Sequence, residues 1–115
     1  VLIQRKNHMI SLFIYGTLAP GRPNEHILKN VKGKWEKAFV KGKLLHQGWG
    51  AEMGFPGIVL NDTEEEIEGY IFTSNELFDK WNELDAFEGE EYARIITQAR
   101  LSNNQVVESY IYSLK

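Results

Sequence analysis

Short apolar runs alternate with clusters of turn-forming residues along most of the chain, a pattern typical of a β-rich protein. Residues 11–15 form a largely apolar run that stops at Gly16, as expected of a strand buried on both faces. Near the end of the chain, residues 92–101 and 106–114 flank a polar turn and predict a hairpin, with Asn103 and Asn104 suited to positive φ. Further extended segments are predicted at residues 35–45, 57–60 and 67–72.

Residues 73–89 have a different periodicity, which predicts the one firm helix. Thr73 and Glu76 have the spacing of a capping box, in which Thr73 caps the amide of Glu76. Gly89 is a suitable terminator. The apolar positions between them fall on one helical stripe, formed by Leu77, Trp81 and Leu84.

A short helix over residues 25–28, with Asn24 as its N-cap, completes the elements that we expect. Their sum is an α+β fold with a mixed or barrel-like sheet. A chain of 115 residues is one domain by length. Residues 1–8 precede Met9 and lack the apolar core of a signal peptide, so we expect an added or alternative-start extension followed by a single domain over residues 9–115.

Composition narrows the classes of function. The chain has no cysteine, which excludes disulfides, thiolate chemistry and Cys-ligated metal, and fits a cytoplasmic location. No apolar run approaches the roughly 20 residues of a membrane helix, so we expect no membrane partner. The net charge is −3, and −5 without residues 1–8, which argues against a nucleic-acid partner. We interpret the lysines between positions 29 and 43 as a solvated strand edge, the alternative being a binding surface.

The next position on the helical stripe after Leu84 is Glu88. Burial without a partner would disfavour its charged form and raise its pKa, which general acid/base catalysis uses. The alternative is a solvated acid at a frayed helix end, and the spacing alone favours that alternative.

The turn at Tyr15-Gly16-Thr17-Leu18 is a second candidate. Gly16 could let backbone N–H groups point outward as a cradle for an anion or oxyanion, with the Thr17 hydroxyl beside them. The plain alternative is a strand that ends in glycine, and the segment lacks the pattern of a P-loop or a dinucleotide site.

Other residues carry weaker signals. The three histidines, at positions 8, 26 and 46, lack metal-ligand spacing, so neither a metal nor a cofactor is expected. Trp35, Trp49 and Trp81 are expected in the core or a pocket wall. Tyr92 and Arg94 share one face of a strand, either as a half-buried surface or with Tyr92 beside Glu88.

In this order and spacing, the motifs resemble the γ-glutamylcyclotransferase-like superfamily over nearly the whole chain from Met9, especially its small bacterial members and the γ-glutamylamine cyclotransferases. The Tyr-Gly-Ser/Thr-Leu signature corresponds to residues 15–18, and a Gly-x-x-Asn segment ends at Asn24. The family's Tyr-Pro-Gly occurs here as Phe55-Pro56-Gly57, with the loss of a hydroxyl. The strand before the helix is Gly69-Tyr70-Ile71-Phe72. Leu-Asp-x-x-Glu-Gly and the Tyr-x-Arg downstream are residues 84–89 and 92–94.

The resemblance implies a small mixed β-barrel with flanking helices and a cavity at one mouth. It implies that Glu88 is the catalytic acid/base and that Tyr15, Gly16, Thr17 and Leu18 bind a γ-glutamyl group through backbone amides. Asn24, Phe55 and Tyr92 join the expected substrate-binding set through the same motifs. Trp49 joins it as a wall of the glycine-rich segment 46–56.

The reaction implied is cofactor-independent conversion of a γ-glutamyl amine or amino acid into 5-oxoproline and a free amine, by a cyclising transferase or lyase. The alternative is a non-catalytic domain of the same fold that binds a small ligand, and a third possibility is an interaction domain with an empty cavity. A monomer or weak homodimer is expected for this size.

Overall fold

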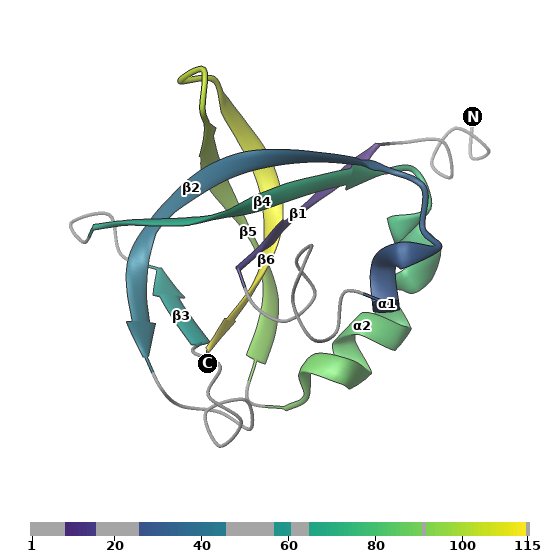
Figure 1. Cartoon of the computed structure of the whole chain (residues 1–115). Helices are drawn as coiled ribbons and strands as arrows, with labels where there is room; N and C mark the ends of the chain where they lie inside the picture. Colours follow the sequence, from purple (N-terminus) through teal and green to yellow (C-terminus); the bar gives the residue numbers. More distant parts are fainter. Residues whose placement is uncertain (1–8, 16–25, 46–56, 61–64, 91, 115) are drawn as a thin grey trace.

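The computed structural model describes residues 9–15, 26–45, 57–60, 65–90 and 92–114. Within them, five strands close into a mixed barrel to which a sixth short strand is added, with the helices on one side (Figure 1). The elements are β1 (Ile10–Ile14), α1 (His26–Lys29), β2 (Lys34–Leu45), β3 (Gly57–Leu60), β4 (Glu66–Ser74), the 3₁₀ helix η3 (Leu77–Lys80), α2 (Trp81–Glu88), β5 (Tyr92–Leu101) and β6 (Val106–Leu114).

The strand order is β3-β2-β4-β1-β6-β5, and a β2–β5 pairing closes the ring. Only the β1–β6 pair is parallel, which makes the sheet mixed. Closure rests on Ala38 opposite Leu101 and Phe39 opposite Arg100. The expected mixed barrel with flanking helices is therefore confirmed.

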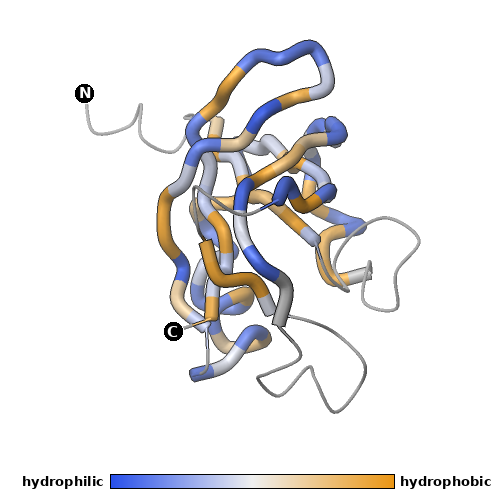
Figure 2. The backbone as a smooth tube through the Cα atoms, turned by 90° about the vertical axis from the view of Figure 1, so that its left-hand side faces the viewer, coloured by the Kyte–Doolittle hydropathy of each residue, from blue (hydrophilic) through white to orange (hydrophobic). Residues whose placement is uncertain are grey.

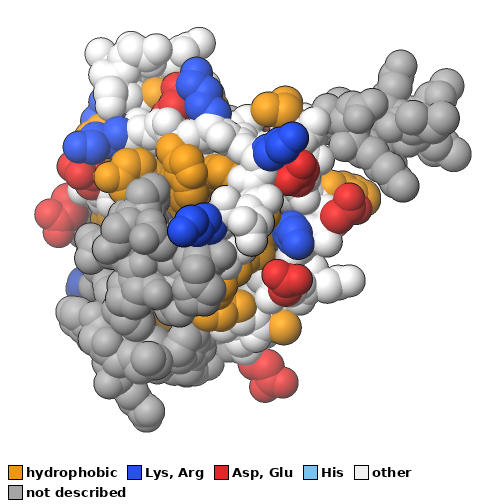
Figure 3. All heavy atoms as spheres, turned by 45° about the vertical axis from the view of Figure 1, so that its right-hand side comes forward, with side chains coloured by type: hydrophobic (Ala, Val, Ile, Leu, Met, Phe, Trp, Pro, Cys, Tyr) orange, Lys and Arg blue, Asp and Glu red, His pale blue; other side chains and the backbone are white. Residues whose placement is uncertain are grey.

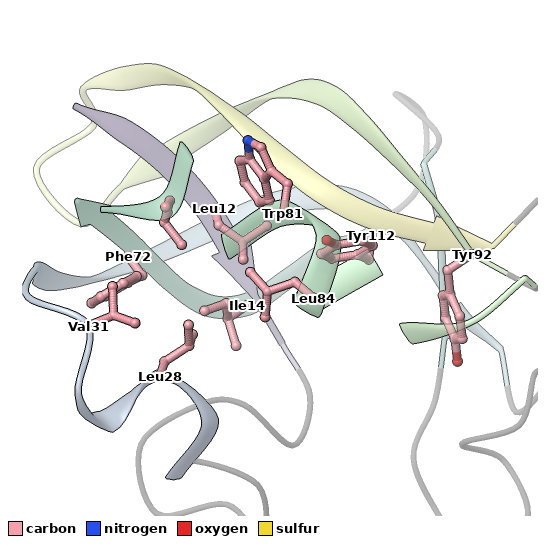
Figure 4. Packing of buried hydrophobic residues seen from close by; sticks show 10 residues of the cluster. Leu12, Ile14, Leu28, Val31, Phe72, Trp81, Leu84, Tyr92 and Tyr112 are labelled. Carbon is pink, nitrogen blue, oxygen red and sulfur yellow. The ribbon is translucent and has the colours of Figure 1, made fainter. Parts of the chain in front are cut away.

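Two apolar cores explain why β1 is apolar on both faces. Phe13 belongs to a cluster inside the barrel, together with Ile71 and Ile111. Leu12 and Ile14 point the other way, into a cluster between the barrel wall and the helices that also holds Leu28 (Figure 4). Because successive side chains of a strand face opposite sides, β1 has to satisfy both cores.

The helix begins differently from the prediction. The Glu76 N–H donates to Ser74 Oγ over 2.9 Å, so Thr73 is not the capping residue and the expected capping box is wrong. The Glu76 carboxylate accepts the N–H of Lys32 over 2.9 Å. Ser74 is buried and bonds the Lys32 carbonyl, so its hydroxyl is fixed where the chain turns. The first turn is 3₁₀, and α-helix begins only at Trp81.

The strand predictions near the end of the chain match residue by residue. β5 and β6 pair from Tyr92 opposite Leu114 to Arg100 opposite Val106. Their connecting turn is the hydrophilic segment at the top of Figure 2, and Asn104 has a φ of 72° whereas Asn103 does not have positive φ.

Strand β2 corrects the interpretation of the lysines. It pairs with β4 along residues 34–41 and, at residues 38 and 39, also with β5 on its other side, so it is not a sheet edge. Its exposed lysines, among them Lys37 paired with Glu68 at 3.4 Å, lie on an outward face. On the face seen in Figure 3, the described acidic and basic side chains are interspersed. No helix within the described ranges is both long and apolar enough to cross a membrane.

Candidate active site

Helix α2 carries Glu88 on its last turn. Trp81 and Leu84 are buried against the barrel, and the stripe that they form continues to Glu88, which is partly buried. Gly89 ends the helix with a φ of 92°, and its N–H donates to the Asp85 carbonyl over 3.0 Å. A glycine is suited to that backbone conformation, because a side chain would be strained there. The predicted helix terminator is confirmed.

Burial raises the pKa of Glu88 from an ordinary 4.5 to about 7. The carboxyl therefore changes its protonation state near neutral pH, as a residue that both accepts and returns a proton must.

Tyr15, just beyond the end of β1, is fixed by its side chain. Its hydroxyl donates to the Tyr112 carbonyl over 2.7 Å and accepts the N–H of Ile58 over 3.1 Å. One phenol thus joins β1 to both β6 and β3. Its single proton is committed, so the hydroxyl retains only an acceptor site.

Electrostatic interactions place Glu88 close to two tyrosines. Burial raises the pKa of Tyr15, and the charges of Glu88 and Tyr92 raise it further. Burial also raises the pKa of Tyr112, as do its bond to Asp85 and the charge of Glu88. Glu88 at the end of α2 therefore lies within electrostatic reach of Tyr15, just beyond β1, and of Tyr112 on β6, and Tyr92 on β5 lies within reach of Tyr15.

Asp85, Tyr112 and Arg94 form a polar cluster that the sequence did not predict, although Asp85 and Arg94 stand in two of the motifs. The Tyr112 phenol donates to Asp85 Oδ1 over 2.5 Å, and Arg94 Nη2 donates to Oδ2 over 3.3 Å. Arg94 Nε lies 3.1 Å from Oδ1 without the alignment of a hydrogen bond. The guanidinium of Arg94 lies 4.2 Å from the centre of the Trp81 ring. A signal existed for Asp85, which lies three residues before Glu88 and therefore near it on the helix surface.

An open hollow of about 490 Å³ lies against this cluster. Asp85, Tyr92, Arg94 and Tyr112 contribute to its lining. In Figure 4, Tyr112 lies beside Leu84, whereas Tyr92 is set apart from the other labelled side chains.

Six of the expected site residues lie outside the described residues, so their role stays a prediction: Gly16, Thr17, Leu18, Asn24, Trp49 and Phe55. Among the side chains that the structure does describe, no group of three or more acids or histidines is arranged to hold a metal ion.

The site thus consists of a small mixed barrel and a half-buried carboxyl at the end of the helix that flanks it. The sequence profile described as "Gamma-glutamyl cyclotransferase, AIG2-like" matches residues 12–115, and the chain belongs to this family. A search of curated proteins finds no match.

Solved structures share this fold. YkqA from Bacillus subtilis is 28% identical with a TM-score of 0.72, and the match covers 94% of this chain. The chain spans only 36% of YkqA. An AIG2-like protein from Mus musculus (22% identity, TM-score 0.71) is matched over 92% of this chain and 77% of its own. A gamma-glutamyl cyclotransferase (17%, 0.65) is matched over 94% and 68%. At these two identities the likeness shows the fold.

Proposed function

We propose that the chain is a γ-glutamyl cyclotransferase that releases 5-oxoproline and a free amine from a γ-glutamyl amine or γ-glutamyl amino acid. The observation that carries this proposal is the half-buried Glu88, whose pKa is about 7, at the end of α2. Membership of the family and the printed name of one similar structure support it.

In the proposed reaction the α-amine of the γ-glutamyl group attacks its own γ-carbonyl. A C–N bond closes the five-membered lactam, and the C–N bond to the leaving amine breaks. Of the three ammonium protons, one stays on the lactam nitrogen and two leave. Glu88 carries one of these to the leaving nitrogen, and the other reaches the released amine, which is a cation at neutral pH.

Because nucleophile and electrophile belong to one substrate, the protein mainly has to hold a folded conformation. Orientation of this kind can lower the barrier by up to about 7–11 kcal/mol. In our proposal the backbone N–H groups of residues 16–18 hold the substrate. The influence of Glu88 on the pKa of Tyr15, the residue directly before this segment, supports the proposal.

Tyr92 is proposed as a substrate contact for two reasons. It lines the hollow, and its charge raises the pKa of Tyr15, as the charge of Glu88 does. Tyr15 is proposed to contact substrate through its backbone or its remaining acceptor site, since its hydroxyl proton is bonded to Tyr112. The proposal includes both amines and amino acids as leaving groups.

The test is release of 5-oxoproline from a panel of γ-glutamyl amines and γ-glutamyl amino acids. Glu88→Gln keeps the shape of the side chain and removes proton transfer, so kcat should fall by roughly 10²–10⁴. Glu83→Gln is the matched control, because Glu83 is an exposed acid on the same helix, and it should leave kcat unchanged. In the wild type, kcat/KM should rise with pH through about 7, as the Glu88 carboxyl becomes a base.

Equal turnover by wild type and Glu88→Gln would remove the acid/base role. If no γ-glutamyl compound yields 5-oxoproline but several raise the melting temperature, the domain binds without catalysis. If no γ-glutamyl compound yields 5-oxoproline and none raises the melting temperature, the third possibility, an interaction domain, stands.

A further inference from the structure

We propose that Tyr112 is a positioning residue for Glu88, acting through Asp85 on the last turn of α2. The catalytic consequence rests on the function proposed above, whereas the geometric part can be tested without turnover. Nothing in the sequence motifs singles out Tyr112, and its role follows from contacts between elements that are distant in the chain.

Tyr112 is anchored to the barrel before it contacts the helix. It pairs with Arg94 in the β5–β6 ladder, and its carbonyl accepts the Tyr15 hydroxyl. The residue is buried, with 5% of its surface exposed. The barrel wall therefore holds the phenol in a fixed direction. The phenol donates to Asp85 over 2.5 Å.

Asp85 links the anchored phenol to the helical turn that carries Glu88. Its side chain accepts the Tyr112 phenol, and its carbonyl accepts the N–H of Gly89, the residue directly after Glu88. Glu88 thus belongs to a single turn whose first residue is tied to the barrel and whose end is closed by Gly89. A charge-assisted bond of this length is among the stronger hydrogen bonds in proteins.

Arg94 supports the same carboxylate from β5, but less directly. Its contacts with Asp85 are 3.1 and 3.3 Å long, and its guanidinium also stacks on Trp81. The Tyr112 bond is shorter and comes from a more deeply buried side chain. We therefore assign the orientation of the turn mainly to Tyr112.

Without the Tyr112 hydroxyl, the last turn should move more freely and Glu88 should gain water. The titratable and charged groups around it in the described structure are Tyr15 and Tyr112, whose pKa its charge raises, Tyr92 near Tyr15, Asp85, which Tyr112 bonds, and Arg94, which pairs with Asp85. Since burial is what moves its titration, better hydration returns the carboxyl toward ordinary behaviour.

The experiment compares Tyr112→Phe with Tyr110→Phe. Tyr110 lies on the same strand, packs edge-on against Trp81 at 5.1 Å and has no side-chain hydrogen bond within the described ranges. Each variant loses one hydroxyl. The carboxyl of Glu88 is followed by ¹³C NMR in glutamate-labelled protein, with the signal assigned by its loss in Glu88→Gln, while thermal unfolding checks that each variant folds.

We expect the titration midpoint of Glu88 to fall in Tyr112→Phe by at least about half a unit and to stay in place in Tyr110→Phe. With an active substrate, kcat should fall about 10- to 100-fold in Tyr112→Phe while KM changes little, because the loss is one of orientation. Asp85→Ala should match Tyr112→Phe, and Asp85→Asn, which keeps an acceptor for the phenol, should lie nearer to the wild type.

An unchanged Glu88 midpoint in Tyr112→Phe would overturn the proposal, as would equal shifts in the two tyrosine variants. If Tyr112→Phe unfolds, the pair of Asp85 variants decides by the same titration. If the wild type cyclises no γ-glutamyl compound, the proposed function fails, yet the NMR comparison still decides whether Tyr112 positions Glu88.

Discussion

Strand β5 carries an arginine at each end, and the two make similar contacts for different purposes. Arg94 pairs with Asp85 and stacks on Trp81, at what we call the site end. Arg100 pairs with Glu66 through bonds of 2.6 and 2.8 Å and lies 4.7 Å from the centre of the Phe39 ring, at what we call the seam end. Judged by geometry, the seam pair is the better ion pair.

The two ends differ in the other bonding partners of the carboxylate that pairs with the arginine. Glu66 and Arg100 are surface groups, and Arg100 reaches past β2, its pairing partner, to β4 where the barrel closes. Asp85 accepts a buried phenol as well as its arginine, and the phenol belongs to the group around Glu88. The number and quality of ionic contacts thus say little about function, whereas a further buried partner of the carboxylate indicates the site.

We expect the largest loss of stability from Asp85→Ala, which removes the carboxylate at the site end. The substitution leaves the buried Tyr112 phenol without its acceptor, which should lower the free energy of unfolding by about 1–3 kcal/mol. Denaturation in urea measures this loss. Glu83→Ala on the same helix is the control, and an equal loss there would show that the contacts of Asp85 are not the cause.

The pH dependence of stability should distinguish the two ends by its sign. The folded pKa of Glu88, about 7, lies above its ordinary value of 4.5, so ionised Glu88 lowers stability above pH 7 and this penalty disappears as the pH falls below 4.5. A rise from 4.5 to about 7 corresponds to at most about 3 kcal/mol. Because Glu88 is only partly buried, we expect Glu88→Gln to stabilise the protein at pH 8 by about 1–2 kcal/mol relative to its effect at pH 4.5. Thermal unfolding at both pH values provides the measurement, and a pH-independent difference would contradict it.

Glu66 should behave in the opposite way and more weakly. Its bond to Arg100 lowers its pKa, so the pair stabilises the fold above the ordinary pKa of Glu66 and this contribution is lost as the pH falls through the lowered folded value. Glu66→Gln should cause a small drop in melting temperature at neutral pH that shrinks in high salt, because exposed pairs are screened. Glu66→Gln should not change the rate of 5-oxoproline release. A lower rate would contradict the conclusion that only the site end serves catalysis.

The sequence predicted what depends on neighbours along the chain. The β5–β6 hairpin and β3 came out with their observed bounds because turn residues and apolar alternation delimit them. Helical spacing drew attention to Glu88 but alone favoured a solvated acid, and the resemblance to the family implied its catalytic role. The start of the helix was misjudged because Ser74, held by the Lys32 carbonyl, competes with Thr73, a contact 42 residues away in the chain.

The surroundings of Glu88 could not be read in the same way. Asp85 meets Tyr112 only because β6 lies beside β1 and α2 packs against the wall that they form. Likewise, nothing local indicates that the Tyr15 hydroxyl joins Ile58 to Tyr112. Such contacts depend on register and packing, which a single sequence does not display.

The bond from Tyr15 to Tyr112 joins residues 97 positions apart. Contacts this distant demand a large loss of chain freedom before they form, and topologies dominated by them fold slowly. The hairpin and helix can form from local segments, but the group around Glu88 requires the parallel contact between the first and last strands. A chain emerging from the ribosome would therefore hold most of its secondary structure before it held an active site, and the site would be among the last features to appear.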